Sequence, residues 1–202
     1  MQLRCKKLLI HIEDNRYRTE LISFLEKIDQ FSFKVEVINV YEEMARRFWK
    51  NHYEIFEEQN DIHLLVVGYD SFGKQIVSEA VRMYHQKMKQ KLSVTILDSF
   101  PEYTSSNRIE KIPFNIEKDS LEAIIEENKR KFTHIFICLD EDYIDLMEGI
   151  ELSETFSDTP IYMNFTDENI EQTLMIATTK TKKSLYSTGI MQDVLTRGYL
   201  GV

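Results

Sequence analysis

The sequence predicts an α/β fold: a doubly wound, mostly parallel sheet with helices on both faces. Short runs of almost wholly apolar residues alternate with amphipathic helical segments along nearly the whole chain. Strands of that kind are typical of a parallel sheet that is covered on both faces. Glycines at positions 68 and 73 also mark a strand that turns directly into a helix, as expected at the edge of such a sheet.

The expected strands are apolar runs bounded by polar or glycine residues. In chain order they span residues 8–12, 35–40, 64–67, 93–97, 134–139 and 160–164, with further extended pieces at 112–114 and 184–190. The expected helices span residues 15–28, 41–58, 73–90, 120–131 and 143–152, with a short one at 168–172, and residues 100–107 are expected to form a loop.

Apolar residues at helical spacing support the first two helices. In residues 15–28 the apolar face consists of Leu21, Phe24, Leu25 and Ile28. In residues 41–58 a second apolar face consists of Met44, Ala45, Phe48, Trp49 and Phe56. We expect this second face to lie either in the core or in a subunit interface.

Composition excludes several classes of partner. The 202 residues include 25 basic and 34 acidic residues, for a net charge of −9, which disfavours nucleic acid and anionic lipid surfaces. No apolar stretch approaches the ~20 residues that span a bilayer, so direct membrane insertion is not expected. Cys5 and Cys138 form neither a disulfide framework nor a zinc site. We expect a cytoplasmic protein.

A weak internal repeat suggests two units. Residues 8–17 align without a gap over residues 64–73, which places Asp14 over Asp70. In the first copy, the bulky Ile12 and Tyr17 replace the two glycines, so it lacks room for a phosphate. We expect a divergent βαβα unit in residues 1–60, which we interpret as a remnant of a preceding module, and a nucleotide-binding domain in residues 61–202. Chance likeness between two βαβ units remains the alternative.

The turn at residues 68–73 is the strongest functional signal. A strand, a glycine turn and a helix together aim a helix N-terminus at a phosphate, and Gly68, Asp70 and Gly73 fall on the positions of a Rossmann-like dinucleotide fingerprint. The middle position normally has no side chain, so the Asp70 carboxylate opposes a diphosphate and disfavours binding. Asp98 ends the next strand, where a carboxylate reads an unphosphorylated ribose, which favours NAD or another adenine nucleotide over NADP.

Two other interpretations of this turn are a P-loop, which one residue opposes, and a purely structural turn, which stays open. A P-loop matches at Gly68, Gly73 and Lys74, but Gln75 replaces the hydroxyl that ligates Mg²⁺. The turn is equally compatible with a purely structural role, in which Asp70 and Ser71 cap the helix.

Catalytic and metal sites have little support. Residues 140–142 are acidic but suit the first turn of a helix, so no metal site is expected there. An oxidoreductase would need a proton donor such as a Tyr-x-x-x-Lys pair, and the nearest match is Tyr84 with Lys87, which has the wrong spacing. No catalytic residue is therefore assigned. Asn115 follows the extended piece at 112–114, where the adenine of a cofactor can be contacted.

Residues 63–73, 94–98 and 133–140 together resemble the TrkA-N type domain, also called RCK, of bacterial potassium channel and transporter regulators. The resemblance covers roughly residues 60–165 and extends to tandem-module relatives. It implies a regulatory domain that binds NAD(H) or another adenine nucleotide, pairs as a homodimer and signals to a membrane-transport or other partner without catalysis. The family prefers glycine where this chain has Asp70.

The same resemblance assigns the cofactor-binding residues by position. Those around the phosphates are Gly68, Tyr69, Asp70, Ser71, Phe72 and Gly73. Asp98 and Ser99 are the corresponding ribose contacts. The alternative function is a degenerate Rossmann scaffold that binds no nucleotide and acts through protein contacts; an NAD-dependent oxidoreductase is the least favoured.

Overall fold

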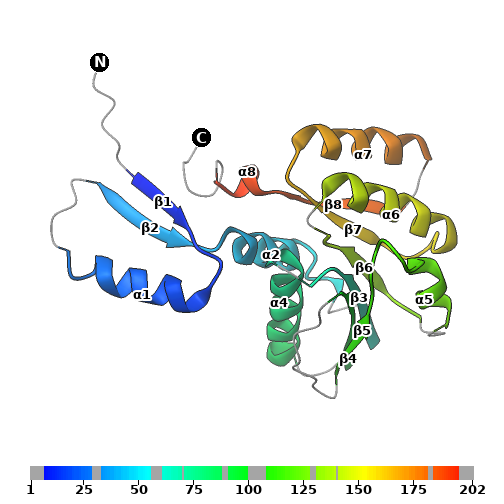
Figure 1. The fold of residues 1–202 in the computed structure, drawn as a ribbon, viewed down its shortest axis with the longest axis horizontal. Helices are drawn as coiled ribbons and strands as arrows, with labels where there is room; N and C mark the ends of the chain where they lie inside the picture. Colours follow the sequence, from blue (N-terminus) through cyan, green and yellow to red (C-terminus); the bar gives the residue numbers. More distant parts are fainter. Residues whose placement is uncertain are drawn as a thin grey trace.

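The expected fold class is confirmed. A computed structural model describes residues 7–28, 33–55, 61–69, 71–87, 91–99, 108–127, 131–139, 141–181 and 184–195. Within them a six-stranded parallel sheet carries helices on both faces (Figure 1). No described helix is both long enough and apolar enough to cross a bilayer.

The elements of this sheet follow in alternation along the chain. Its strands are β3 (Asp61–Val67), β4 (Lys91–Asp98), β5 (Ile109–Pro113), β6 (His134–Ile137), β7 (Ile161–Phe165) and β8 (Leu185–Ile190). Its helices are α2 (Val40–Asn51), α4 (Ser71–Lys87), α5 (Leu121–Glu127), α6 (Asp142–Thr155) and α7 (Glu168–Thr181), with a short α8 (Met191–Asp193) at the end.

The strand order creates a point where the direction of winding reverses. The order across the sheet is β5-β4-β3-β6-β7-β8, and every neighbouring pair is parallel. The chain therefore moves outward from β3 to β5, returns to β6 beside β3, and then moves outward the other way. In open α/β sheets ligands bind outside the carboxyl ends of the two strands that flank such a point, here β3 and β6.

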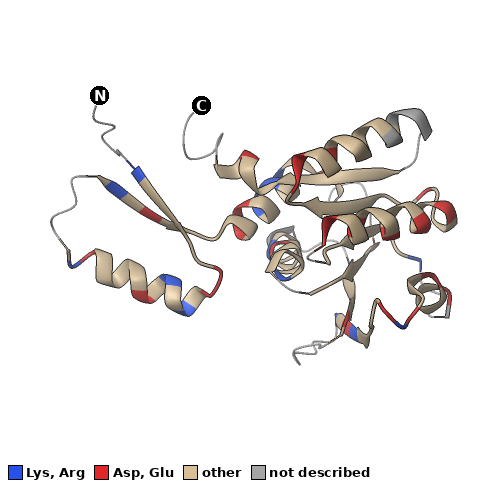
Figure 2. Cartoon of the chain, turned by 45° about the horizontal axis from the view of Figure 1, so that its top comes forward, with Lys and Arg blue, Asp and Glu red and all other residues tan. Residues whose placement is uncertain are grey.

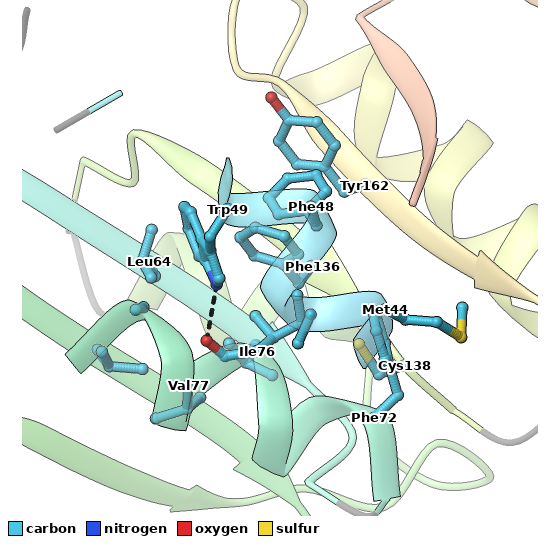
Figure 3. Close-up of a cluster of buried hydrophobic side chains, with 14 of the residues drawn as sticks. Met44, Phe48, Trp49, Leu64, Phe72, Ile76, Val77, Phe136, Cys138 and Tyr162 are labelled. Carbon is cyan, nitrogen blue, oxygen red and sulfur yellow. Dashed lines mark hydrogen bonds between the residues drawn. The ribbon is translucent and has the colours of Figure 1, made fainter. Parts of the chain in front are cut away.

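The helices form two cores, one on each face. On one face α2 and α4 pack together over the sheet, and on the other lie α5, α6 and α7 (Figure 1). In Figure 3 the rings of Phe48 and Trp49 lie beside Phe136, at centroid distances of 5.3 and 5.5 Å. The indole Nε1 of Trp49 donates to the carbonyl of Ile76 in α4 at 2.9 Å. The apolar face of α2 thus lies in the core.

The first copy of the repeat forms a separate small sheet. β1 (Lys7–His11), α1 (Asn15–Leu25) and β2 (Lys34–Ile38) form a parallel βαβ unit, which lies apart from the six-stranded sheet in Figure 1. Ile12 N donates to Ile38 O at 2.9 Å, and the aligned Gly68 N donates to Leu97 O at 2.8 Å. In both copies of the repeat, the residue just after the first strand therefore donates a further hydrogen bond to the strand beside it.

The sequence underestimated one helix. We expected a helix over residues 168–172, whereas α7 continues to Thr181. Its threonines lower the apparent helical preference, but within the helix Thr173 and Thr178 donate to carbonyls four residues earlier, at 2.8 and 3.1 Å. The expected loop at residues 100–107 and the end of the helix expected over 41–58 fall partly or wholly outside the described residues.

The backbone after β3 and the backbone after β6 lie very close together at Gly68 and Cys138. Cys138 N donates to Val67 O at 2.7 Å, and Gly68 has a φ of +84°. A Cβ on residue 68 would lie 2.1 Å from the carbonyl oxygen of Cys138, and one on residue 73 would lie 2.2 Å from the Gly68 carbonyl oxygen. Both positions therefore require glycine.

His134 is a buried titratable group that lies beside an aromatic ring of the core. Its side chain is 2% exposed and stacks on Tyr162 at a centroid distance of 6.2 Å. Burial, and then the charge of His52, lowers the pKa of His134 from 6.5 to about 4. The folded state therefore favours the neutral ring.

Replacing Gly68 by alanine should destabilise the fold by about 4 kcal/mol or more, because backbone strain is combined with overlap on Cys138. Gly189→Ala is a matched control: its φ is +96°, but nothing lies within 4 Å of the added Cβ, so only strain of about 1–2 kcal/mol is expected. Urea denaturation measures both. Equal losses would contradict the close approach.

His134 should make stability depend on pH. Between pH 6.5 and 4 the unfolded chain binds a proton that the folded chain does not, so stability falls as the pH falls and is fully present above 6.5. The pKa difference corresponds to about 3 kcal/mol. Urea midpoints from pH 7.5 to 4.5 should fall more steeply for the parent than for His134→Phe, and parallel curves would refute this role of His134.

Candidate functional site

The predicted turn lies at the point where the winding reverses. β3 ends at Val67, Gly68 crosses against β6, and α4 begins at Ser71. The N–H groups of the first turn of α4 therefore lie beside the carboxyl edge of the sheet, the geometry that suits an anion. Asp70, the residue expected to oppose a diphosphate, lies outside the described residues.

A cavity of about 330 Å³ opens at the same edge, beyond β4 and β5. It is lined by Leu97, Asp98, Ser99, Phe114, Asn115, Ile116, Glu117 and Leu139. Its volume falls in the lower range of small-molecule pockets. The structure thus brings together Asp98, Ser99 and Asn115, which the sequence had selected from separate strand ends.

The walls of this cavity are held by local hydrogen bonds. One carboxylate oxygen of Asp98 accepts from Ser99 N at 2.7 Å, and the backbone of Asp98 accepts from Phe114 N at 3.0 Å. Asn115 Oδ1 accepts from Glu117 N at 3.0 Å, in a turn centred on Asn115. The loops after β4 and β5 are therefore tied together with Asp98 between them.

Two lysines surround the ring of Tyr69. Lys111 Nζ lies 4.9 Å from the ring centroid and Lys74 Nζ 6.0 Å from it. The buried Nζ of Lys111 has no hydrogen-bond partner among the described residues. In a chain whose acidic residues are spread over most elements (Figure 2), these ammonium groups give the turn local positive charge.

The side chain of Phe72 is part of the hydrophobic core. Its side chain is 2% exposed and belongs to the same core as Cys138, close to it in Figure 3. Its ring centroid lies 6.5 Å from that of Tyr41. Only the backbone of Phe72 is therefore suited to contact a ligand at the turn.

Two acidic residues near this edge were not selected from the sequence. Asp145, 2% exposed, accepts from Leu139 N at 2.8 Å and so fixes one wall of the cavity. The hydroxyl of Ser71 donates to the carboxylate of Glu13, which follows β1. The only sequence feature that pointed to Asp145 was its position as an acidic residue in the first turn of a helix. Nothing in the sequence connected Glu13 with Ser71.

Asp142, in the acidic run after β6, joins two elements of the fold. The carboxylate of Asp142 accepts from Thr166 N at 2.9 Å and from Asp167 N at 2.6 Å, and so links α6 to the end of β7. No cluster of three potential metal-ligating side chains occurs in the described part of the chain, and Asp140 lies outside it.

Comparison with known proteins gives structural matches only. No family model and no curated protein matches the sequence. The structure of GsuK bound to ADP is similar over 90% of this chain, with a TM-score of 0.58 and 10% identity. That of the GsuK channel is similar over 90%, with a TM-score of 0.55 and 11% identity, and that of a GsuK mutant over 96%, with 0.59 and 9%.

This chain spans about half the length of those proteins or less: 41% of the first two and 52% of the mutant. At an identity near 10%, the structural similarity shows a shared fold and no more. The chain therefore has the Rossmann-like fold found in the GsuK channel structures.

Proposed function

We propose that this chain is a non-catalytic regulatory module that binds an adenine nucleotide and signals to a partner protein. The observation that carries the proposal is the placement of three features at the carboxyl ends of the strands where the winding reverses: the glycine turn at Gly68, the start of α4 and the cavity lined by Asp98. Open α/β sheets bind their ligands beyond the carboxyl ends of the strands at such a reversal, which supports a ligand beside Gly68.

These features suit the parts of a nucleotide. The first turn of α4 offers N–H groups to the phosphates, with the ammonium of Lys74 nearby. Asp98 is at the strand end that suits ribose hydroxyls, and Ser99 lies next to it. The remaining cavity, with Phe114 and Asn115 in its lining, suits an adenine.

The choice of ligand and partner follows from the comparisons. GsuK was solved bound to ADP and is a channel, and this chain shares its fold. We therefore propose ADP as ligand and an ion channel or transport protein as partner, with NAD(H) as the second candidate ligand because the family resemblance implies it. A homodimer, as the family resemblance implies, is the proposed assembly.

Isothermal titration with ADP, NAD, NADH, ATP and AMP tests the proposal. We expect binding in the micromolar range for at least one of them, and Asp98→Asn should weaken it on the order of tenfold through loss of a charge-assisted hydrogen bond. Asp61→Asn is the matched control, since Asp61 begins β3 at the opposite edge of the sheet. If Asp98→Asn and Asp61→Asn bind like the parent, the ribose assignment is wrong.

Asp70→Gly should tighten the binding of ADP several-fold, because it removes a carboxylate from the diphosphate position of the fingerprint. The same titration measures it, with adenosine as a ligand that lacks phosphate and should be unaffected. An unchanged ADP affinity would refute this role for Asp70. Binding by Asp70→Gly alone, with none by the parent, would instead favour the degenerate scaffold.

A further inference from the structure

The contact between Glu13 and Ser71 joins the small β1–α1–β2 unit to the proposed phosphate site. Glu13 follows β1, and its carboxylate accepts from the hydroxyl of Ser71, the first residue of α4. The two residues are 58 positions apart in the sequence. The contact therefore depends on how the small unit is held against the main sheet.

The segment that carries Glu13 is fixed to the start of α2. Asn39, 2% exposed, donates from its side chain to the Glu13 carbonyl at 3.2 Å and also caps α2. His11 Nδ1 accepts from Val40 N at 3.2 Å. In a neutral ring the hydrogen is then on Nε2, which lies 3.5 Å from Glu13 Oε1. Three separate interactions thus position Glu13.

The start of α2 is in turn fixed on α4. The two helices make an extensive contact, which includes the hydrogen bond from Trp49, in the last turn of α2, to Ile76. The ring of Tyr41 also contacts both His11 and Phe72, at centroid distances of 5.6 and 6.5 Å. The carboxyl end of β1 and the amino ends of α2 and α4 therefore converge on one place.

A carboxylate beside the start of α4 is placed where a ligand phosphate is expected. There it benefits from the partial positive charge of the helix N-terminus, as a phosphate would. A bound diphosphate and the Glu13 carboxylate would repel each other in a partly desolvated site. Occupancy by one therefore disfavours the other.

We infer that Glu13 is an internal competitor for the phosphate subsite, so that an adenine nucleotide displaces it from Ser71 and loosens the β1–α1–β2 unit. This inference rests on the proposed function and adds its regulation. The small unit is the element that changes with ligand. By reciprocity, a partner that draws the unit away raises the affinity for nucleotide by the same factor.

The test compares Glu13→Gln with Asp14→Asn in titrations with ADP and with adenosine. Both variants remove one negative charge, but the Asp14 carboxylate contacts Arg16 and the backbone of α1. Glu13→Gln should bind ADP on the order of fivefold or more tightly than the parent, whereas Asp14→Asn should change it by less than about twofold. Adenosine, which has no phosphate, should bind all three proteins alike.

The outcomes separate this inference from the proposed function. Tighter ADP binding by Glu13→Gln, or binding by that variant alone, supports the competition. Equal ADP affinities for parent and variant overturn it and leave the nucleotide site intact. No binding of ADP by any of the three proteins overturns both.

Hydrogen exchange provides a second readout that needs no variant. Saturating ADP should speed amide exchange in residues 7–28 of the parent, because the contact that holds the small unit is lost. Saturating adenosine should leave that exchange unchanged. Unchanged or slower exchange in residues 7–28 with ADP would overturn the inference.

Discussion

The close approach of β3 to β6 at Gly68 is the contact on which the rest of the structure depends. The Cys138 carbonyl occupies the space where a side chain on residue 68 would begin, and the carbonyl of Gly68 does the same for residue 73. Because no side chain separates these backbones, α4 can start directly at the sheet edge. From the same place the strands continue outward in opposite directions, and ligands of open α/β sheets bind beyond the carboxyl ends of the two strands that flank such a point, here β3 and β6.

The fold class was predictable because strands buried on both faces leave a plain signal in the sequence. All four residues of β6 are buried, and the run from Leu64 to Val67 is fully buried too. Edge and polar elements gave weaker signals. β5 begins at Ile109 rather than at residue 112, because the charged and partly buried Glu110 and Lys111 lower the apolar character of an edge strand. α7 was too short in the prediction because its threonines have a low helical preference, whereas in the structure the hydroxyls of Thr173 and Thr178 donate to carbonyls within the helix.

The candidate site was predictable where it depends on strand ends. Gly68 and Asn115 follow strands of a parallel sheet and Asp98 ends one, and the carboxyl ends of such strands meet at one edge. The contribution of Glu13 was not predictable in this way. It depends on the packing of α2 on α4, which brings the end of β1 to the start of α4 across 58 residues. Asp145 resembled any acidic residue in a first helical turn, and only its bond to Leu139 N reveals its place in the cavity wall.

Amide chemical shifts of the ¹⁵N-labelled protein during titration with ADP test whether an adenine nucleotide binds beside Gly68 at the carboxyl ends of the strands. We expect the largest shifts at Gly68, Ser71 and Gly73 and at Asp98, Ser99 and Asn115. Binding at this place is contradicted if ADP leaves these amides unchanged, or if the largest shifts lie instead around the separate cavity of about 540 Å³ between α2, α7 and β8.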